Sequence, residues 1–237
     1  MENSATENHF DVVVIGAGPA GTTTAALLAG QGRNVLVLEK EKFPRYHVGE
    51  SMMPFCYYTL EKLGLADKMD EIGFQQKHSV QFVGTSGAVS RPFYFFQHDD
   101  HPSAVTWQVE RQVFDQLLVD NAREKGADVR EQHSVVEVIR DESGKVAGVV
   151  ATDAEEDRHT FHAAVVVDAS GRDCVVAAKN KWRNKDPELR KIAIWTYYEG
   201  AMRDPGLDAG STTVAYIPEK GWFWYIPMRD NRISVGV

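Results

Sequence analysis

The chain has 237 residues, a formal net charge of −8 and 43% hydrophobic residues. This length suits one or two domains with a buried core. The acidic balance and the lack of a basic run argue against nucleic acid or an anionic membrane as the main partner and favour a small molecule. No apolar run approaches the ~18 residues of a membrane span, and the first ten residues are polar and acidic, so a cytoplasmic protein is predicted.

The cysteines and histidines predict no metal or redox chemistry. Cys56 and Cys174 lie far apart and outside any metal-binding spacing, so both are expected to be small buried residues. The eight histidines do not form a zinc spacing either. No metal site is therefore expected.

Residues 11–40 predict a strand, a glycine-rich turn, a helix and a second strand, and the first strand is an apolar β-branched run typical of a strand covered on both faces. In the G-A-G-P-A-G turn, Gly16 allows the tight bend, Gly18 leaves room for a pyrophosphate, and Gly21 lets the helix pack on the strand. The helix, expected over residues 19–30, directs its amide end at the pyrophosphate. The dinucleotide-contacting residues expected here are Gly16, Gly18, Pro19, Ala20 and Gly21.

An acidic residue follows the second strand, which is expected over residues 34–38. Glu39 comes 18 residues after Gly21. An acidic side chain at this point can accept hydrogen bonds from an adenosine ribose and disfavours a 2′-phosphate. Lys40 is assigned to the cofactor together with Glu39, and a solvated surface charge is its alternative.

The next segment, F-P-R-Y-H-V-G-E-S over residues 43–51, is expected to be a loop. Pro44 and Gly49 prevent a regular helix before Ser51, which is predicted to be the N-cap of a helix over residues 55–63. Ligands lie at the carboxyl ends of such strands, so the loop is expected to line a cofactor, with an ordinary surface connection as the alternative. The loop residues assigned to the cofactor are Arg45, Gly49, Glu50 and Ser51.

These motifs together resemble a known family. G-A-G-P-A-G, then E-K and F-P-R-Y-H-V-G-E-S, is similar to FAD-dependent oxidoreductases, most of all to flavin-dependent tryptophan and phenol halogenases and their geranylgeranyl-reductase-like relatives. The resemblance implies FAD rather than NAD, with the G-E-S loop along the flavin. It also implies an α/β fold in which a glutathione-reductase-type Rossmann FAD-binding domain (residues 10–40 and 105–176) is joined to a mixed β-sheet substrate domain (residues 41–104 and 177–237).

Lys77 is the expected catalytic residue. Alternation over residues 77–83 predicts a half-buried strand that begins at Lys77, with a returning strand over residues 89–96. Its position resembles that of the lysine by which flavin-dependent halogenases hold or carry the active halogen. An enclosed lysine can lose its charge and become a nucleophile, or stay charged and polarise hypohalous acid. A solvated strand-end lysine is the alternative.

Arg111 precedes a predicted helix over residues 112–125, where a positive charge is unfavourable for the helix dipole. In the resembled family the arginine of R-x-x-F-D-x-x-L reaches the cofactor, and a solvated arginine is the alternative. Three short strands over residues 134–163 then predict a small β-meander insert.

Residues 164–172, A-V-V-V-D-A-S-G-R, predict a buried strand followed by a small-residue turn. The segment resembles the second nucleotide-contacting segment of the family, in which Asp168 and Gly171 would face the dinucleotide. A glycine at this point allows close approach of the backbone.

The last part of the chain is rich in strands and contains a W-x-W-x-I-P pattern. Period two places Trp222 and Trp224 on one face of their strand and Phe223 and Tyr225 on the other. The resemblance assigns flavin shielding to Trp222, Trp224 and Pro227, while plain core packing is the alternative. The strands are expected over residues 192–198, 212–217, 221–227 and 232–237.

One family segment has no match. Full-length relatives have a G-D-A-x-G-type segment after the substrate sheet, whereas this chain stops within an apolar strand at residues 233–237. A truncated product is therefore predicted, and its flavin binding and activity are left open.

The function predicted on these grounds is that of an FAD-dependent oxidoreductase, most similar to a flavin-dependent halogenase. FAD reduced by a separate NADH-dependent flavin reductase would react with O₂ and halide to give hypohalous acid, and Lys77 would direct this acid at an electron-rich aromatic substrate. The alternatives are an FAD-dependent monooxygenase or a geranylgeranyl-reductase-like enzyme without halide chemistry, and an inactive FAD-fold fragment.

Overall fold

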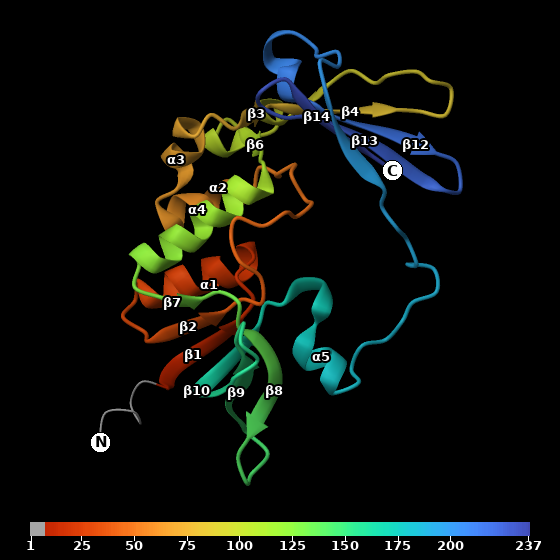
Figure 1. Cartoon of the computed structure of the whole chain (residues 1–237). Helices are drawn as coiled ribbons and strands as arrows, with labels where there is room; N and C mark the ends of the chain where they lie inside the picture. The colour runs from red at the N-terminus through yellow and green to blue at the C-terminus, as the bar shows by residue number, and fades with distance from the viewer. Residues whose placement is uncertain (1–7) are drawn as a thin grey trace. The chain divides into compact units, whose positions relative to one another are not determined.

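The computed structural model describes residues 8–237, and the chain divides into two compact units that each combine two stretches. Unit 1 comprises Met1–Tyr46 and Gln112–Lys185, and unit 2 comprises His47–Arg111 and Asp186–Val237. Figure 1 labels the elements of both units. Within residues 8–237, no helix combines the length and the apolar character that a membrane crossing requires.

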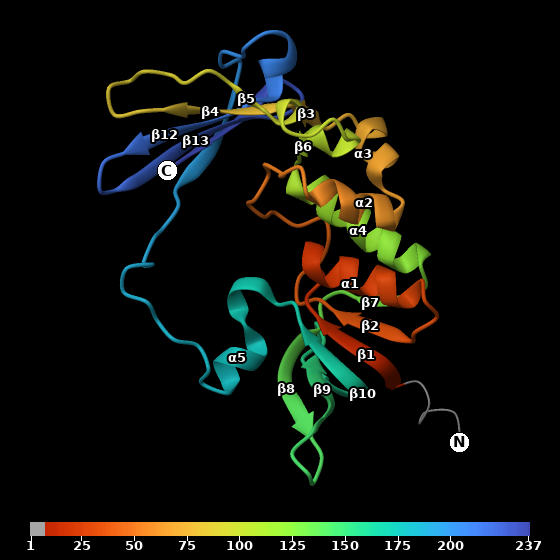
Figure 2. The same ribbon diagram turned by 180° about the vertical axis from the view of Figure 1, so that it is seen from behind.

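Unit 1 is built around one six-stranded sheet (Figure 2). Its strands are β1 (His9–Ile15), β2 (Val35–Leu38), β7 (Asp128–Arg130), β8 (Ser134–Arg140), β9 (Val146–Thr152) and β10 (Arg158–Asp168). They are ordered β7-β2-β1-β10-β9-β8, with the first four parallel and the last two antiparallel to their neighbours. The helices are α1 (Pro19–Ala29), most of α4 (Arg111–Glu124), the 3₁₀ turn η3 (Gly171–Asp173) and α5 (Val175–Lys179).

The apolar run of β1 is buried on both faces, as its composition predicts. Val14 faces α1, because its Cγ1 lies 3.2 Å from a Cβ built on Gly21. Val13 faces the other way and packs in a buried cluster with Val149 of β9 and Phe161 of β10. A strand between two such layers needs apolar side chains at every position, so strict alternation is absent here.

The strand β10, which lies between β1 and β9 in the sheet, is longer than expected. Segments expected separately over residues 160–163 and 164–168 form the single strand β10, which pairs antiparallel with β9 up to His162 and parallel with β1 from His162 onward. Because β9 leaves β10 at that residue, the following part of β10 has a strand on one side only. Val165 is 51% exposed there, so the prediction of a buried strand over this segment is wrong.

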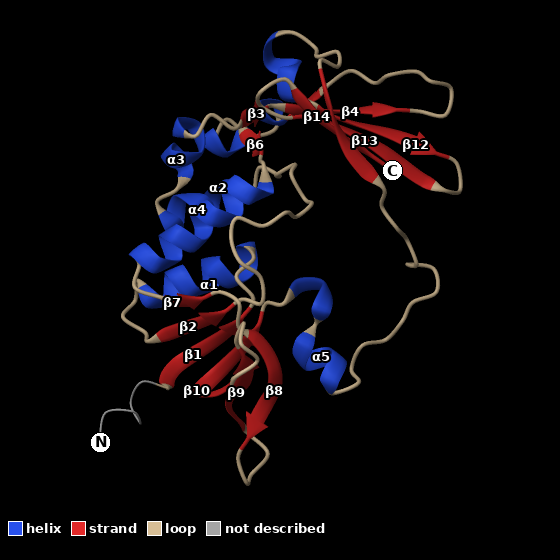
Figure 3. Ribbon diagram, in the orientation of Figure 1, coloured by secondary structure: helices blue, strands red, loops and turns tan. Residues whose placement is uncertain are grey.

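Unit 2 contains a second six-stranded sheet and a separate two-stranded pair (Figure 3). Their strands are β3 (Gln75–Lys77), β4 (Ser79–Val83), β5 (Phe93–Tyr94), β6 (Thr106–Gln108), β11 (Trp195–Glu199), β12 (Thr212–Ile217), β13 (Gly221–Pro227) and β14 (Arg232–Gly236). The large sheet has the order β11-β14-β13-β12-β4-β5, and β3 pairs with β6. The helices are α2 (Cys56–Leu63) and α3 (Ala66–Glu71), with 3₁₀ turns η1 (Phe95–Gln97), η2 (Pro102–Ala104) and η4 (Gly206–Gly210).

The strand expected over residues 77–83 is split at His78. Lys77 ends β3 and pairs with Thr106 of β6, whereas Ser79 begins β4 and pairs with Tyr94 of β5. Lys77 therefore belongs to the two-stranded pair and not to the large sheet. The polar and apolar alternation continues across the break, so the sequence pattern does not reveal it.

Two other local predictions are wrong. The returning strand expected over residues 89–96 is reduced to the two residues of β5, because a 3₁₀ turn begins at Phe95. Ser51 is not the N-cap of α2, whose N-cap position is Phe55. Ser51 instead forms a β-bridge with Gln108, four residues before that cap.

Gly148→Ala is expected to destabilise unit 1 by about 3 kcal/mol, because a Cβ there would lie 2.1 Å from the carbonyl oxygen of Phe161 at a φ of +152°. The matched control is Gly144→Ala, at a φ of +83° with no atom within 4 Å of the new Cβ, and its expected cost is about 1 kcal/mol. Chemical denaturation of both variants measures the difference. Equal losses of stability in the two variants would show that Gly148 of β9 is not closely packed against Phe161 of β10.

Candidate functional site

In unit 1, the glycine-rich turn joins β1 to α1, and two of its glycines are required by packing. A Cβ on Gly16 would lie 2.7 Å from the carbonyl oxygen of Ala169, and one on Gly21 would lie 1.9 Å from the oxygen of Gly16. Gly18 differs, because Arg45 Nη2 at 3.5 Å is the protein atom nearest to its Cβ position within 4 Å. The turn is therefore packed against protein at both ends and open at its centre.

The amide end of α1 is suited to an anion. Gly18 is the N-cap residue and makes no side-chain cap, and the first turn of α1 contains no acidic residue. The positive end of the helix dipole is thus not neutralised by its own helix, which favours a negatively charged ligand group.

Glu39 fixes the shape of this turn. Its side chain is buried, and its two carboxylate oxygens accept hydrogen bonds from the backbone N–H groups of Ala17 (2.8 Å) and Glu41 (2.9 Å). Each oxygen keeps a further lone pair, so a ribose hydroxyl can still donate to the carboxylate. The sequence predicted the ribose contact, whereas the hydrogen bond to the glycine turn is apparent only in the structure.

Arg45 lies beside the open centre of the turn. Its guanidinium is 3.6 Å from Asp115 of α4 and 4.0 Å from Glu39, and it stacks over the ring of Phe43 at 5.1 Å. Asp115 is fully buried. The sequence placed Arg45 in the cofactor loop but did not identify Asp115 as its partner. The available signal was the acidic position within R-x-x-F-D-x-x-L, next to a buried phenylalanine.

The remaining predicted contacts of unit 1 lie near the end of β10. The carboxylate of Asp168 accepts hydrogen bonds from the N–H groups of Ser170 (3.1 Å) and Val176 (2.8 Å), which orders the turn before α5. Gly171 has a φ of +62° and no atom near its Cβ position. Lys40 is half-exposed and forms an ion pair with Asp173 at 2.5 Å, which raises the pKa of Lys40.

In unit 2, the loop at residues 48–51 is held from two sides. Arg111 Nη1 donates to the carbonyl oxygens of Val48 (3.0 Å) and Gly49 (3.5 Å). Glu50 is buried and accepts a hydrogen bond from the hydroxyl of Tyr197 on β11. Arg111 thus contacts the backbone of the predicted cofactor loop within this unit.

Lys77 is buried at the end of that loop, with 1% of its surface exposed. Its Nζ donates to Ser51 Oγ (2.9 Å) and to the carbonyl oxygen of Met52 (3.0 Å), and it lies 5.5 Å from the centre of the Phe95 ring. Burial lowers the pKa of Lys77 to about 8. The alternative of a solvated strand-end lysine is therefore wrong.

The large sheet of unit 2 presents an aromatic face toward the same loop. The β12–β13 register pairs Val214 with Trp224 and Tyr216 with Trp222, so both tryptophans share the face of Thr212. Thr212 Oγ1 contacts Ser51 Oγ at 2.9 Å, which places the loop on this face. The prediction that the two tryptophans share one face is confirmed, and Trp222 is 55% exposed.

The two tryptophans differ in their surroundings. Trp224 Nε1 donates to Ser234 Oγ at 3.2 Å, and the indole lies so close to Gly236 that a Cβ there would be 2.2 Å from it. Pro227 ends β13 and is buried. Trp224 is thus fixed by β14, whereas Trp222 leaves its ring accessible.

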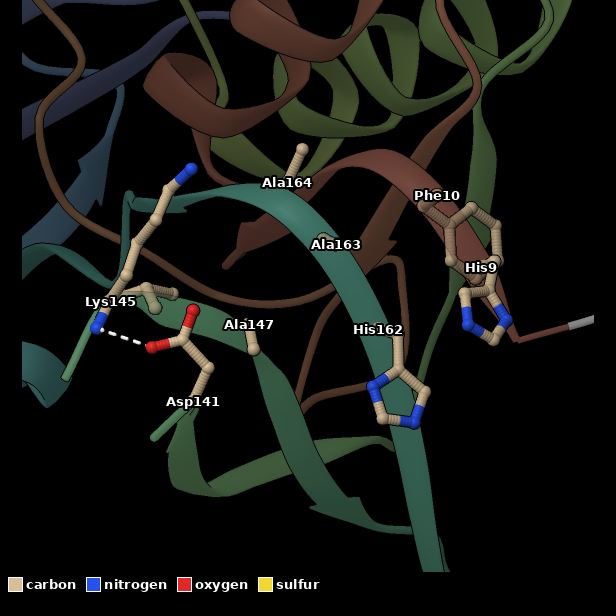
Figure 4. Close-up of a pocket in the computed structure, with 9 residues that line it drawn as sticks. His9, Phe10, Asp141, Lys145, Ala147, His162, Ala163 and Ala164 are labelled. Carbon is tan, nitrogen blue, oxygen red and sulfur yellow. Dashed lines mark hydrogen bonds between the residues drawn. The ribbon is translucent and has the colours of Figure 1, made fainter. Parts of the chain in front are cut away.

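A shallow cavity of about 310 Å³ lies within unit 1 (Figure 4). It is lined by His9 and Phe10 at the start of β1 and by His162 and Ala163 of β10, while Gly16 follows the opposite end of β1. Asp141 Oδ1 accepts from the backbone N–H of Lys145 at 3.0 Å on its rim. Ligands of open α/β sheets bind at the carboxyl ends of the strands, so this cavity is not the dinucleotide site.

Sequence reasoning missed three residues around Lys77. Thr212, Tyr197 and Gln108 come from distant strands. The hydroxyls of Thr212 and Tyr197 contact the loop, and the Gln108 amide donates to Thr212. Each is an ordinary strand residue by pattern, and no motif marks it. Their role depends on pairings more than 80 positions apart in the chain, which local sequence does not encode.

Comparison with known proteins gives a consistent result. The family described as FAD binding domain matches residues 9–234 of this chain. A 1H-pyrrole-2-carbonyl-(peptidyl-carrier protein) brominase of Pseudoalteromonas luteoviolacea (strain 2ta16) is 34% identical over 96% of this chain and 54% of the brominase. The flavin-dependent halogenase armH4 of Armillaria mellea is 34% identical over 97% of this chain and 45% of that protein.

A solved structure shows the same likeness in three dimensions. The myxobacterial chondrochloren halogenase CndH, an FAD-dependent halogenase, superposes with a TM-score of 0.82 at 35% identity. The match covers 97% of this chain and 52% of the halogenase. The chain therefore spans about half the length of the relatives that it matches.

Lys77→Met is expected to raise the free energy of unfolding at pH 7 by about 1 to 3 kcal/mol, because it removes a buried charge whose pKa falls from 10.5 to about 8 on folding. The charged Lys77 destabilises the fold fully below pH 8, and this destabilisation disappears as the pH rises toward 10.5. The gain in the free energy of unfolding of Lys77→Met should therefore shrink over that range. Denaturation at several pH values measures it. Lys62→Met, on an exposed lysine of α2, is the control with no expected change. A pH-independent loss of stability in Lys77→Met would contradict the lowered pKa of the buried Lys77.

Proposed function

Because the chain belongs to the FAD binding domain family, we propose that it forms part of a flavin-dependent halogenase. The main support is the buried Lys77, which lies at the end of the cofactor loop and near an aromatic sheet face. The protein would use reduced FAD, O₂ and a halide ion to halogenate an electron-rich aromatic substrate in the cytoplasm. The pyrrole group in the name of the brominase relative supports this substrate class.

The residues of unit 1 fit a dinucleotide. The open centre of the turn at Gly18 leaves space for a diphosphate, which the amide end of α1 and Arg45 would bind. Glu39 has lone pairs available for the ribose hydroxyls. We assign Gly49, Glu50, Ser51, Arg111, Asp168 and Gly171 to the same cofactor. When bound, reduced FAD supplies the electrons for the reduction of O₂, which with halide gives hypohalous acid.

Lys77 can act on hypohalous acid in either charge state. The charged Nζ donates a hydrogen bond to the oxygen of the acid and makes the halogen more electrophilic. The neutral Nζ attacks the halogen, forming an N–halogen bond while the oxygen leaves as water after taking up the amine proton. A pKa of about 8 leaves both forms accessible near neutral pH.

The aromatic face of the large sheet has the role of a barrier. Trp222 and Trp224 on this face, together with Pro227 at the end of β13, would separate the organic substrate from the flavin, so that the halogen reaches the substrate only through Lys77. We also propose that a separate NADH-dependent flavin reductase supplies the reduced FAD, as the resemblance to flavin-dependent halogenases implies.

Gly18→Ala tests the cofactor site. The new methyl group fits the free chain, because its nearest protein atom lies 3.5 Å away at a normal φ, but it fills the space required by a diphosphate. We expect at least a 10-fold rise in the Kd for FAD with an unchanged unfolding midpoint, measured by titration of flavin fluorescence. Gly84→Ala, with 3.9 Å to its nearest atom, is the control of unchanged affinity. An unchanged Kd for FAD in Gly18→Ala would contradict a diphosphate site at this turn.

Lys77→Met tests the halogenation step in the protein that contains this chain. With reduced FAD, chloride or bromide, and a panel of phenols, indoles and pyrroles, the variant should lose at least about 100-fold in turnover, read by isotope pattern in mass spectrometry. Lys62→Met should retain full turnover, because that lysine is exposed on α2. Intact halogenation by Lys77→Met would contradict the proposed role. Consumption of NADH or NADPH by the purified protein alone would instead favour a monooxygenase.

A further inference from the structure

The ammonium of Lys77 is stabilised by dipoles rather than by an opposite charge. Among residues 8–237, no carboxylate forms an ion pair with Lys77. Its hydrogen-bond acceptors are Ser51 Oγ and the Met52 carbonyl oxygen, with Met53 Sδ at 4.0 Å. A buried charge held in this way depends strongly on each acceptor.

The elements packed around Lys77 add little charge. Phe95 of η1 presents its ring to Nζ, and Thr106 of β6 lies directly opposite Lys77 in the strand pair. The Cys56 thiol of α2 is the titratable neighbour, and it raises the pKa of Lys77 against the larger effect of burial. The Ser51 hydroxyl is therefore the principal side-chain acceptor for this ammonium.

Ser51 is fixed by a chain of hydrogen bonds. Its Oγ lies 2.9 Å from Thr212 Oγ1, and Thr212 Oγ1 accepts from Gln108 Nε2 at 2.8 Å. The same Nε2 donates to the carbonyl oxygen of Gly210 at 2.8 Å, and Gln108 is fully buried. Loop, β12 and β6 thus meet at a single buried polar cluster.

The donor directions in this cluster follow from its chemistry. Charged Nζ and amide Nε2 can only donate, so Ser51 Oγ accepts from Lys77 and Thr212 Oγ1 accepts from Gln108. The bond between the two hydroxyls is the one in which either oxygen can be the donor. With Lys77 charged, the Ser51 hydroxyl can donate to Thr212, whereas with Lys77 neutral, Thr212 can donate to Ser51 while Ser51 donates to the Nζ lone pair.

We propose that Ser51 and Thr212 are positioning residues for Lys77, whose paired hydroxyls orient Nζ in both charge states and favour the charged one. The two hydroxyls exchange donor and acceptor roles as the amine gains or loses its proton. This inference rests on the proposed function of Lys77, and it explains why the loop ends in serine at this point.

The test is an NMR titration of the whole chain with ¹³C-labelled lysine, without flavin or halide. The Lys77 signal is identified by its absence from Lys77→Met, and its midpoint is the pKa of Lys77. Ser51→Ala should lower that pKa by about one unit, because a charge-assisted hydrogen bond is lost. Thr212→Val should lower it by about half a unit, and Thr212→Ser should restore it, because the hydroxyl is retained.

Ser103→Ala is the matched control, since it removes another buried hydroxyl of unit 2 that bonds to Tyr58 and Asp99 and should leave the Lys77 pKa unchanged. If Ser51→Ala does not fold, the comparison of Thr212→Val with Thr212→Ser decides the question. An unchanged or raised pKa in the hydroxyl-deleted variants would overturn the proposal. Halogenation retained by Lys77→Met would overturn the proposed role of Lys77 in the reaction and leave this titration result standing.

Discussion

The unit 2 site depends on burying the Lys77 ammonium without a counter-ion from any of the residues 8–237. Burying the Lys77 ammonium costs free energy, because its hydrating water is replaced by only two oxygen acceptors and an aromatic ring. The cost lowers the pKa of Lys77 to about 8, far enough for neutral amine to exist near physiological pH. A carboxylate in the place of Ser51 would raise the pKa of Lys77 and keep the amine protonated. The loop supplies the acceptors through Ser51 and Met52, and Thr212 of β12 and Gln108 of β6 hold Ser51 in place.

In unit 1, the buried residue Glu39 combines two roles. Glu39 lies where a ribose-binding acid is expected, and its carboxylate also holds the glycine turn through the Ala17 amide. Asp115 and Glu39 in turn keep Arg45 next to Gly18. The anion site is therefore formed by a backbone turn, a helix terminus and one arginine, each oriented by a buried acid. Such support keeps a binding site ordered before its ligand arrives.

The comparisons extend over residues of both units. The FAD binding domain family matches residues 9–234, and two halogenase relatives are 34% identical over 96% and 97% of this chain. Because the chain spans about half of their length, the activity is proposed for the protein that contains it. Residues 8–237 hold both the expected dinucleotide turn and the enclosed lysine.

The sequence by itself determined the first strand, turn and helix, the amphipathic helix α4, and the shared face of Trp222 and Trp224. These features follow from short-range periodicity and from glycine positions where a Cβ has no room. Only the tertiary structure decided that the strand breaks at His78, that β10 is one strand with two kinds of partner, and that Lys77 is buried against Ser51. Those outcomes depend on pairing between strands distant in the chain, and the energy of such pairing is absent from any local pattern.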